Sequence, residues 1–190
     1  MGDPKKPRKK YETPSHPYRM DRLQTELDLV GRYGLRNKRE VWRARSILGR
    51  WRAQARSMLA LDEEERAIKE RVLINKMARY GLLPETATFE AVLSLDVEDV
   101  LKRRLQTIVY EKGLARTPHQ ARQMIVHRHI MVGDHIVTSP SYLVPVSEEN
   151  TIRYSPRSPY NNEDHPMRPQ AKPQQSDEEG EVEVTETEGE

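Results

Sequence analysis

Apolar residues recur at helical spacing through the first half of the chain, and this pattern predicts a succession of helices. Residues 22–33 carry a short apolar stripe that ends near Gly31 or Gly34. A longer stripe lies within residues 36–61 and predicts a long helix with arginines on its other faces. This stripe consists of Val41, Ala44, Leu48, Trp51, Ala55 and Met58.

The longer stripe also fits a heptad repeat, so a structural coiled-coil protein is an alternative interpretation. The stripe spans fewer than three heptads, and Gly49 would cost about 1 kcal/mol in a helix interior. We therefore expect the helix to pack against another helix of the same chain. A stable dimer in light scattering would favour the coiled coil instead.

Helix-start and helix-stop residues divide the rest of this region. Asp62 is expected to cap the next helix, with Glu65 completing a capping box and Gly81 ending the helix. After Ser94 the apolar pattern restarts and predicts one continuous helix over residues 97–113.

Beyond residue 116 the spacing changes from helix to strand. Thr117 is expected to cap a helix that begins at Pro118. Alternating residues then predict strands at 129–132 and 135–137 around a Gly-Asp turn. Two further strands are expected at 143–146 and 151–154. The pattern as a whole indicates an α+β chain with helices first and a small antiparallel sheet last.

Composition limits what such a chain can do. Of its 190 residues, 35% are hydrophobic and 33% are charged, which leaves material for only a thin core. The absence of cysteine excludes disulfides and thiolate metal sites. The sequence has no apolar run of roughly 20 residues, as a membrane span needs, and no apolar segment typical of a signal peptide. We expect a cytoplasmic protein that does not bind membranes.

The net charge of +2 conceals a strong segregation of charge. Residues 1–60 carry 16 Lys and Arg against 6 Asp and Glu, whereas residues 61–100 carry 5 against 10. Residues 101–160 carry 9 against 4, and residues 161–190 carry 2 against 10. Two basic blocks separated by an acidic one predict two surfaces that face a polyanion.

Both ends of the chain have the composition of disordered segments. Residues 1–20 hold four prolines and a basic run, which predicts an extended basic arm. Residues 155–173 hold five prolines, and residues 177–190 hold eight acids and no base. The last segment is therefore expected to be a disordered acidic tail.

The stretch HRHIMVGDH, residues 127–135, contains the most catalytic-looking cluster: His127, His129, Asp134 and His135. His129 and His135 could be neighbours across a hairpin and form a two-ligand site. A catalytic metal needs three protein ligands, and Asp134 is favoured at a turn for backbone reasons. We expect no metal here.

The sequence also has no GxSxG, P-loop, GxGxxG or HExxH motif, so no catalytic residue, cofactor or small-molecule substrate is expected.

Basic and polar residues on two consecutive helices are more informative. The helices would bring Lys102, Arg103 and Arg104 together with Arg116, His119, Gln120, Arg122 and Gln123. Arginine side chains and helix N-termini bind phosphates well, and exposed aromatics are few, so recognition of folded RNA by its shape and backbone is favoured.

Changing Arg103, Arg104 and Arg122 to glutamine is expected to weaken RNA binding and hardly to affect thermal stability.

Several motifs resemble the small-subunit ribosomal protein four family, the S-four family. These are RRLQT (103–107), the helix with Ala121, Arg122 and Ile125, the strand RHI-x-V (128–132) and the corner Pro140-Ser141-Tyr142. Upstream, YGLRNKREVWR (33–43) is similar to the archaeal and eukaryotic branch, as is RSPY (157–160). The resemblance covers roughly residues 10–165.

The resemblance implies a domain organisation. It comprises a basic arm (1–20), an N-terminal helical domain (21–100), an S-four-type (alpha-L) RNA-binding module (101–154), a Pro-rich extension (155–176) and the acidic tail (177–190). The module would contain two helices and a small antiparallel sheet. Many modules of this type carry Ser-Arg where Thr117-Pro118 stands, so Arg116 is expected to supply that arginine contact.

The resemblance also implies a function. The chain would be a structural constituent of the cytoplasmic small ribosomal subunit that binds 16S-type ribosomal RNA directly. It would nucleate assembly of the subunit body and contribute to translational accuracy, together with the small-subunit ribosomal protein families five and twelve. An RNA-modifying enzyme with the same module, similar to a pseudouridine synthase, is the alternative, although it would need a catalytic domain. The RNA-binding residues expected are Arg36, Asn37, Lys38, Arg39, Arg43, Lys102, Arg103, Arg104, Arg116, Thr117, His119, Gln120, Arg122, Gln123, His127, Arg128 and His129.

Overall fold

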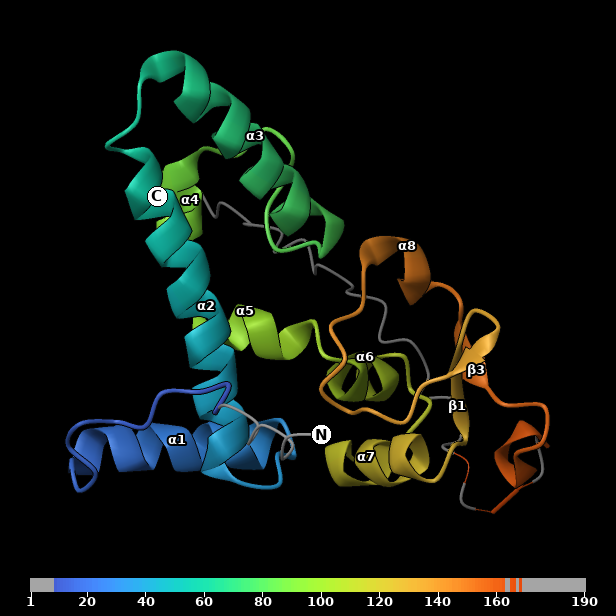
Figure 1. Ribbon diagram of the computed structural model, residues 1–190. Coiled ribbons are helices and arrows are strands. Elements are labelled where there is room, and N and C mark those ends of the chain that lie inside the picture. Colours follow the sequence, from blue (N-terminus) through green and yellow to red (C-terminus); the bar gives the residue numbers. More distant parts are fainter. Residues whose placement is uncertain (1–8, 163–164, 167, 169–190) are drawn as a thin grey trace, which may run out of the picture.

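A computed structural model of the chain describes residues 9–162, 165, 166 and 168 (Figure 1). Its first part is helical: α1 (Met20–Arg32), α2 (Lys38–Met58), α3 (Glu63–Arg79), α4 (Phe89–Ser94) and α5 (Val97–Lys102). Its second part is mixed: α6 (Leu105–Glu111), α7 (Pro118–Val126), β1 (Ile130–Val132), β2 (His135–Ile136), α8 (Val146–Glu149), β3 (Ile152–Tyr154) and the 3-10 helix η1 (Pro159–Asn161). The predicted α+β class is confirmed.

Helix α2 forms the spine of the first part. All six residues of its predicted apolar stripe are buried, and α1, α3, α4 and α5 pack against this helix. In Figure 1, α1 crosses the N-terminal end of α2, and α3 folds back from its C-terminal end. The stripe is therefore covered by the chain's own helices, as expected, and the coiled-coil interpretation is wrong.

The buried apolar residues form two clusters. The first cluster runs from Tyr33 to Leu101 and is centred on α2. The second runs from Leu105 to Tyr154 and joins α6 and α7 to the sheet. The chain passes from one cluster to the other at residues 102–104, so two separately packed units meet at this point.

The helix predicted over residues 97–113 is broken into α5 and α6. Arg104 has extended backbone angles and forms an isolated β-bridge with Leu143. The N–H of Leu105 then donates to the carbonyl of Tyr142 at 2.8 Å. A continuous helical pattern thus yields to pairing with a segment some forty residues away, because buried backbone groups must be hydrogen-bonded.

The sheet has the order β2-β1-β3, with antiparallel pairing throughout. The strand expected at 151–154 is confirmed as β3, in which Tyr154 pairs with Ile130. The strand expected at 143–146 is wrong: Leu143 makes only the bridge to Arg104, and Val146 begins α8.

Capping confirms one prediction and corrects another. The Thr117 hydroxyl accepts the N–H of Gln120 at 3.2 Å, and Pro118 occupies the first helical position, as expected. Asp62 precedes α3, but its side chain makes no capping hydrogen bond, so the predicted capping box is absent from this described helix.

None of the helices among the described residues combines the length and apolar character of a membrane span.

Parts of the predicted terminal segments lie within the described residues. Near the N-terminus, the N–H of Glu12 donates to Ser46 Oγ at 3.0 Å, so this part of the arm follows α2. In the Pro-rich extension, Ser155 and Ser158 are buried against the second unit. The beginning of the basic arm and the whole predicted acidic tail, 177–190, lie outside the described residues.

A close backbone contact joins the two units and leads to a stability prediction. Gly34 has φ +58, and a Cβ at this position would lie 2.7 Å from Pro118 Cβ. We expect Gly34→Ala to lower the free energy of unfolding by about 2 kcal/mol through strain and overlap. Gly49→Ala is the control, because its Cβ meets nothing within 4 Å and should stabilise the α2 helix by about 1 kcal/mol. Urea unfolding of both variants measures this, and equal effects would contradict it.

Candidate nucleic-acid interface

The interface between the two units is built around the side chain of Gln106. This residue lies on α6, is 1% exposed, and reaches into the turn between α1 and α2. Its Nε2 lies within hydrogen-bonding distance of the carbonyls of Tyr33, Gly34 and Pro118, at 3.2, 2.8 and 3.0 Å. These contacts place the N-terminus of α7 beside the N-terminus of α2, because Pro118 starts one helix and Gly34 closely precedes the other.

Glu40 forms the charged part of the same interface. Its carboxylate accepts a hydrogen bond from Arg104 Nη2 at 2.6 Å. It also accepts hydrogen bonds from two nitrogens of Arg122, at 2.6 and 3.3 Å. Burial raises the pKa of Glu40, but the hydrogen bonds and charges of Arg122 and Arg104 outweigh this effect and leave that pKa below its ordinary value. Glu40 is therefore ionised and connects α2 to α6 and α7.

The three consecutive basic residues 102–104 do not share a polar face, which corrects the sequence-based expectation. Lys102 is exposed, and its Nζ lies 3.6 Å from Asp99. Arg103 is half-buried and binds Glu149 at 2.9 Å. Arg104 is only 5% exposed, because the break between α5 and α6 turns it inward toward Glu40. The expectation that changing Arg103, Arg104 and Arg122 would hardly affect stability assumed solvated positions, whereas Arg104 is buried and the other two are half-buried and ion-paired.

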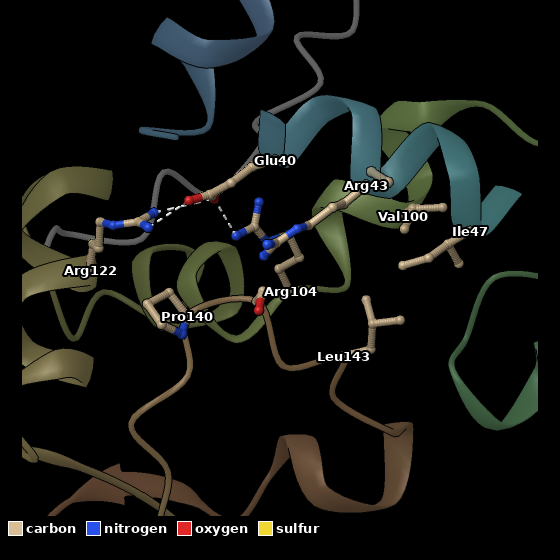
Figure 2. A pocket seen from close by; sticks show the side chains of 10 residues that line it. Glu40, Arg43, Ile47, Val100, Arg104, Arg122, Pro140 and Leu143 are labelled. Carbon is tan, nitrogen blue, oxygen red and sulfur yellow. Dashed lines mark hydrogen bonds and ion pairs between the residues drawn. The ribbon is translucent and has the colours of Figure 1, made fainter. Parts of the chain in front are cut away.

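A pocket of about 140 Å³ opens beside this ion-paired group (Figure 2). Its polar lining comes from Glu40, Arg43, Arg104, Arg122 and Ser141, and its apolar lining includes Ile47, Val100 and Leu143. Figure 2 shows that the side chains of Arg43 and Arg104 approach each other from different elements. The pocket therefore lies between the two units and is strongly cationic.

The N-terminal turns of α2 and α7 carry the exposed basic and polar groups of the interface. From α2 and the residues before it, Arg36, Asn37, Arg39 and Arg43 are exposed, whereas Lys38 is half-buried at 3.8 Å from Glu26. From α7 and the residues before it, Arg116, Thr117, His119 and Gln123 are exposed. Since Gln106 and Glu40 hold the two helix starts together, these groups form one basic surface, which we call the junction surface.

Arg116 and Gln120, two of the predicted RNA-binding residues, also have partners within the protein. The backbone N–H of Arg116 donates to Gln120 Oε1 at 2.7 Å, which fixes the start of α7. The Arg116 guanidinium donates to the carbonyls of Pro166 and Arg168, at 2.9 and 3.0 Å. The described part of the Pro-rich extension is thus attached beside the junction surface.

The histidine-containing segment lies at the other end of α7, away from the junction surface. Arg128 adopts φ 64, which turns the chain from α7 into β1. His129 Nδ1 lies 3.0 Å from Ser158 Oγ, and burial, followed by the charge of His127, lowers the pKa of His129. His127 and Arg128 are exposed and form a separate polar area.

The register of the sheet removes the two-histidine arrangement considered from the sequence. His135 pairs with Val132, so it lies well beyond His129 along the hairpin. Within the described part of the chain, no group of three or more His, Asp and Glu side chains is placed to hold a metal ion.

Sequence reasoning missed Glu40 and Gln106. Glu40 did leave a signal, because it is the single acid in the basic segment RNKREVWRAR, residues 36–45. Such an isolated acid among arginines is a candidate for a structural ion pair. Gln106 left no comparable signal, since a glutamine beside apolar residues does not reveal three distant carbonyl partners.

Comparisons with known proteins agree with this geometry. The S4 domain family matches residues 103–150, which begin where the second unit begins. The chain is 57% identical over 155 residues to "Small ribosomal subunit protein uS4" of Saccharolobus islandicus, covering 81% of the chain and 86% of the relative. It is 54% identical over 160 residues to the protein of the same name from Hyperthermus butylicus, covering 84% and 91%. The similarity therefore extends through both units.

Proposed function

The chain belongs to the uS4 family of archaeal small ribosomal subunit proteins, and we propose that it binds small-subunit ribosomal RNA directly through the junction surface. As a member of this family it is a structural constituent of the small subunit that carries an S4 RNA-binding domain. The observation that supports the direct contact is the convergence of exposed basic groups from two separately packed units.

The proposed mechanism is binding without covalent chemistry. Exposed arginines at the start of α2 neutralise phosphates, while the start of α7 presents His119, Gln123 and the positive end of its dipole. Arg103 and Arg104 serve mainly to hold the two units together. His127, Arg128 and His129 offer a second contact area one helix length away.

The rigid connection between the units supports a role in assembly. Two RNA segments that bind opposite sides of the junction surface would be held at a fixed spacing by Glu40 and Gln106. We propose that the chain binds 16S-type RNA early, nucleates the subunit body in the cytoplasm, and affects translational accuracy beside the family five and twelve proteins.

An RNA-modifying enzyme that shares only the S4 domain is not favoured. The similarity to the uS4 relatives covers 155 to 160 residues, well beyond residues 103–150. The first unit is a bundle of helices around α2.

Sedimentation with ribosomal particles tests the proposed function. We expect the tagged full chain, expressed in an archaeal host, to sediment with small subunits and to remain there after a wash at about 0.5 M salt, because part of the contact is buried from screening ions. Recovery at the top of the gradient, or equally with large subunits, would contradict the proposal.

A further inference from the structure

The pocket between the units has more positive charge than its protein partners neutralise. Arg43, Arg104 and Arg122 all line it, and among the described residues Glu40 is the only acid that does. Glu40 is already fully engaged by Arg104 and Arg122. The pocket therefore carries an excess of two positive charges.

Arg43 holds the most available of these charges. It is exposed on α2, and no hydrogen bond or ion pair to it occurs within the described residues. Its charge instead acts against the charged form of Arg104: burial lowers the pKa of Arg104, Glu40 opposes this effect, and Arg122 and Arg43 lower that pKa further. The guanidinium groups of Arg43 and Arg104 approach each other at the pocket (Figure 2).

Arg104, which also lines the pocket, carries a buried donor without a partner in the described part of the chain. This residue is 5% exposed, and its Nε has no hydrogen-bond partner among the residues that the structure describes. A buried donor without a partner costs about 1–3 kcal/mol. An anion in the pocket would relieve the repulsion between Arg43 and Arg104.

We propose that this pocket, between α2 and the S4 domain, is a binding site for a single phosphate group of the RNA backbone. Arg43 and Arg104 supply charged donors, and Ser141 also lines the pocket. Planar guanidinium groups bind phosphate oxygens in pairs, which favours a phosphate over a halide ion. The inference deepens the proposed function and rests on it, because the phosphate is assigned to RNA.

Such a phosphate would contact both units at once. Arg43 lies on α2 of the first unit, and Ser141 lies between β2 and α8 of the second. Its binding would add to the connection that Glu40 already makes, so RNA binding would stabilise the relative placement of the units. This consequence distinguishes the pocket from the exposed arginines around it.

Thermal unfolding of the RNA-free chain tests the pocket by itself. Inorganic phosphate should raise the Tm of the wild-type protein above its value in chloride at equal ionic strength. Arg43→Gln should abolish this rise. Arg45→Gln is the matched control, because Arg45 is exposed and points about 200° away around the same helix. An equal rise in both variants would overturn the phosphate site.

RNA binding tests the source of the phosphate. With small-subunit ribosomal RNA, Arg43→Gln should weaken binding about fivefold or more and reduce the slope of log K against log salt by about 1, and Arg45→Gln should change neither. A lost Tm rise with an unchanged slope would mean that the pocket takes free phosphate and not RNA, which overturns the assignment. If the wild-type chain binds no RNA, the proposed function fails, whereas the Tm result still decides the pocket.

Discussion

Replacing Glu40 by glutamine is expected to lower the free energy of unfolding by about 3 kcal/mol, because it leaves the buried Arg104 without its counter-ion. Glu40 also holds Arg122 through two hydrogen bonds, at 2.6 and 3.3 Å. Glutamine keeps the shape of the side chain but cannot neutralise either guanidinium. Chemical denaturation of the full chain measures the change. An unfolding free energy equal to that of the wild-type protein would contradict the role of Glu40.

The acid dependence of stability gives the same variant a second signature. The arginines hold the pKa of Glu40 below its ordinary value of 4.5, despite burial. A carboxylate with a lowered pKa contributes stability above its unfolded-state pKa and loses it as pH falls through the folded-state pKa. The wild-type chain should therefore lose stability more steeply than Glu40→Gln below about pH 4.5. Glu65→Gln is the control, because Glu65 forms an exposed ion pair with Lys69 whose loss should leave stability unchanged.

The double change Arg36→Gln and Arg39→Gln is expected to weaken binding to small-subunit ribosomal RNA roughly 30-fold at about 0.1 M salt, if each phosphate contact contributes about 1 kcal/mol. The slope of log K against log salt should fall by about 2. Both residues are exposed at the start of α2, so the fold should be retained. Filter binding across a range of salt concentrations measures both quantities.

A matched double variant separates the junction surface from general positive charge. Arg50→Gln with Arg56→Gln removes the same charge from the C-terminal half of α2, where Arg56 lies about 25 Å along the helix from Arg39. We expect this control to retain nearly wild-type affinity and slope. Equal losses in the two double variants would show that RNA responds to net charge and not to this surface.

The elements that the sequence predicts best are those whose packing depends on a local pattern. The stripe on α2 repeats over eighteen residues, and each of its positions is buried. The start of α7 follows from Thr117 and Pro118, because capping involves only neighbouring residues. Local chemistry of this kind needs no knowledge of distant contacts.

The break between α5 and α6 could not be predicted in this way. The apolar spacing continues from Val97 to Ile108 as in one helix, and the interruption depends on pairing with Leu143. A second long-range contact, with Glu40, determines where the side chain of Arg104 lies. Three consecutive basic residues suggest a solvated face, but a partner 64 residues away draws the third one inside.

The candidate site was predicted in part for the same reason. Exposed basic residues on α2 and α7 were recognisable from charge, and the structure brings them together. The pocket itself was not foreseen, since it depends on the closure of Gly34 on Pro118 and on the buried amide of Gln106. Sequence indicates which residues can meet a phosphate, and tertiary contacts determine which of them are free to do so.

Competition between two ribosomal RNAs tests the central claim most directly. The full chain is titrated with labelled archaeal small-subunit RNA in the presence of unlabelled small-subunit RNA or a large-subunit transcript of equal length. We expect the small-subunit RNA to compete at least about 100-fold more effectively at about 0.15 M salt, because specific contacts add to the non-specific attraction of phosphates. Equal competition by the two RNAs would contradict specific recognition of the small-subunit RNA by this chain.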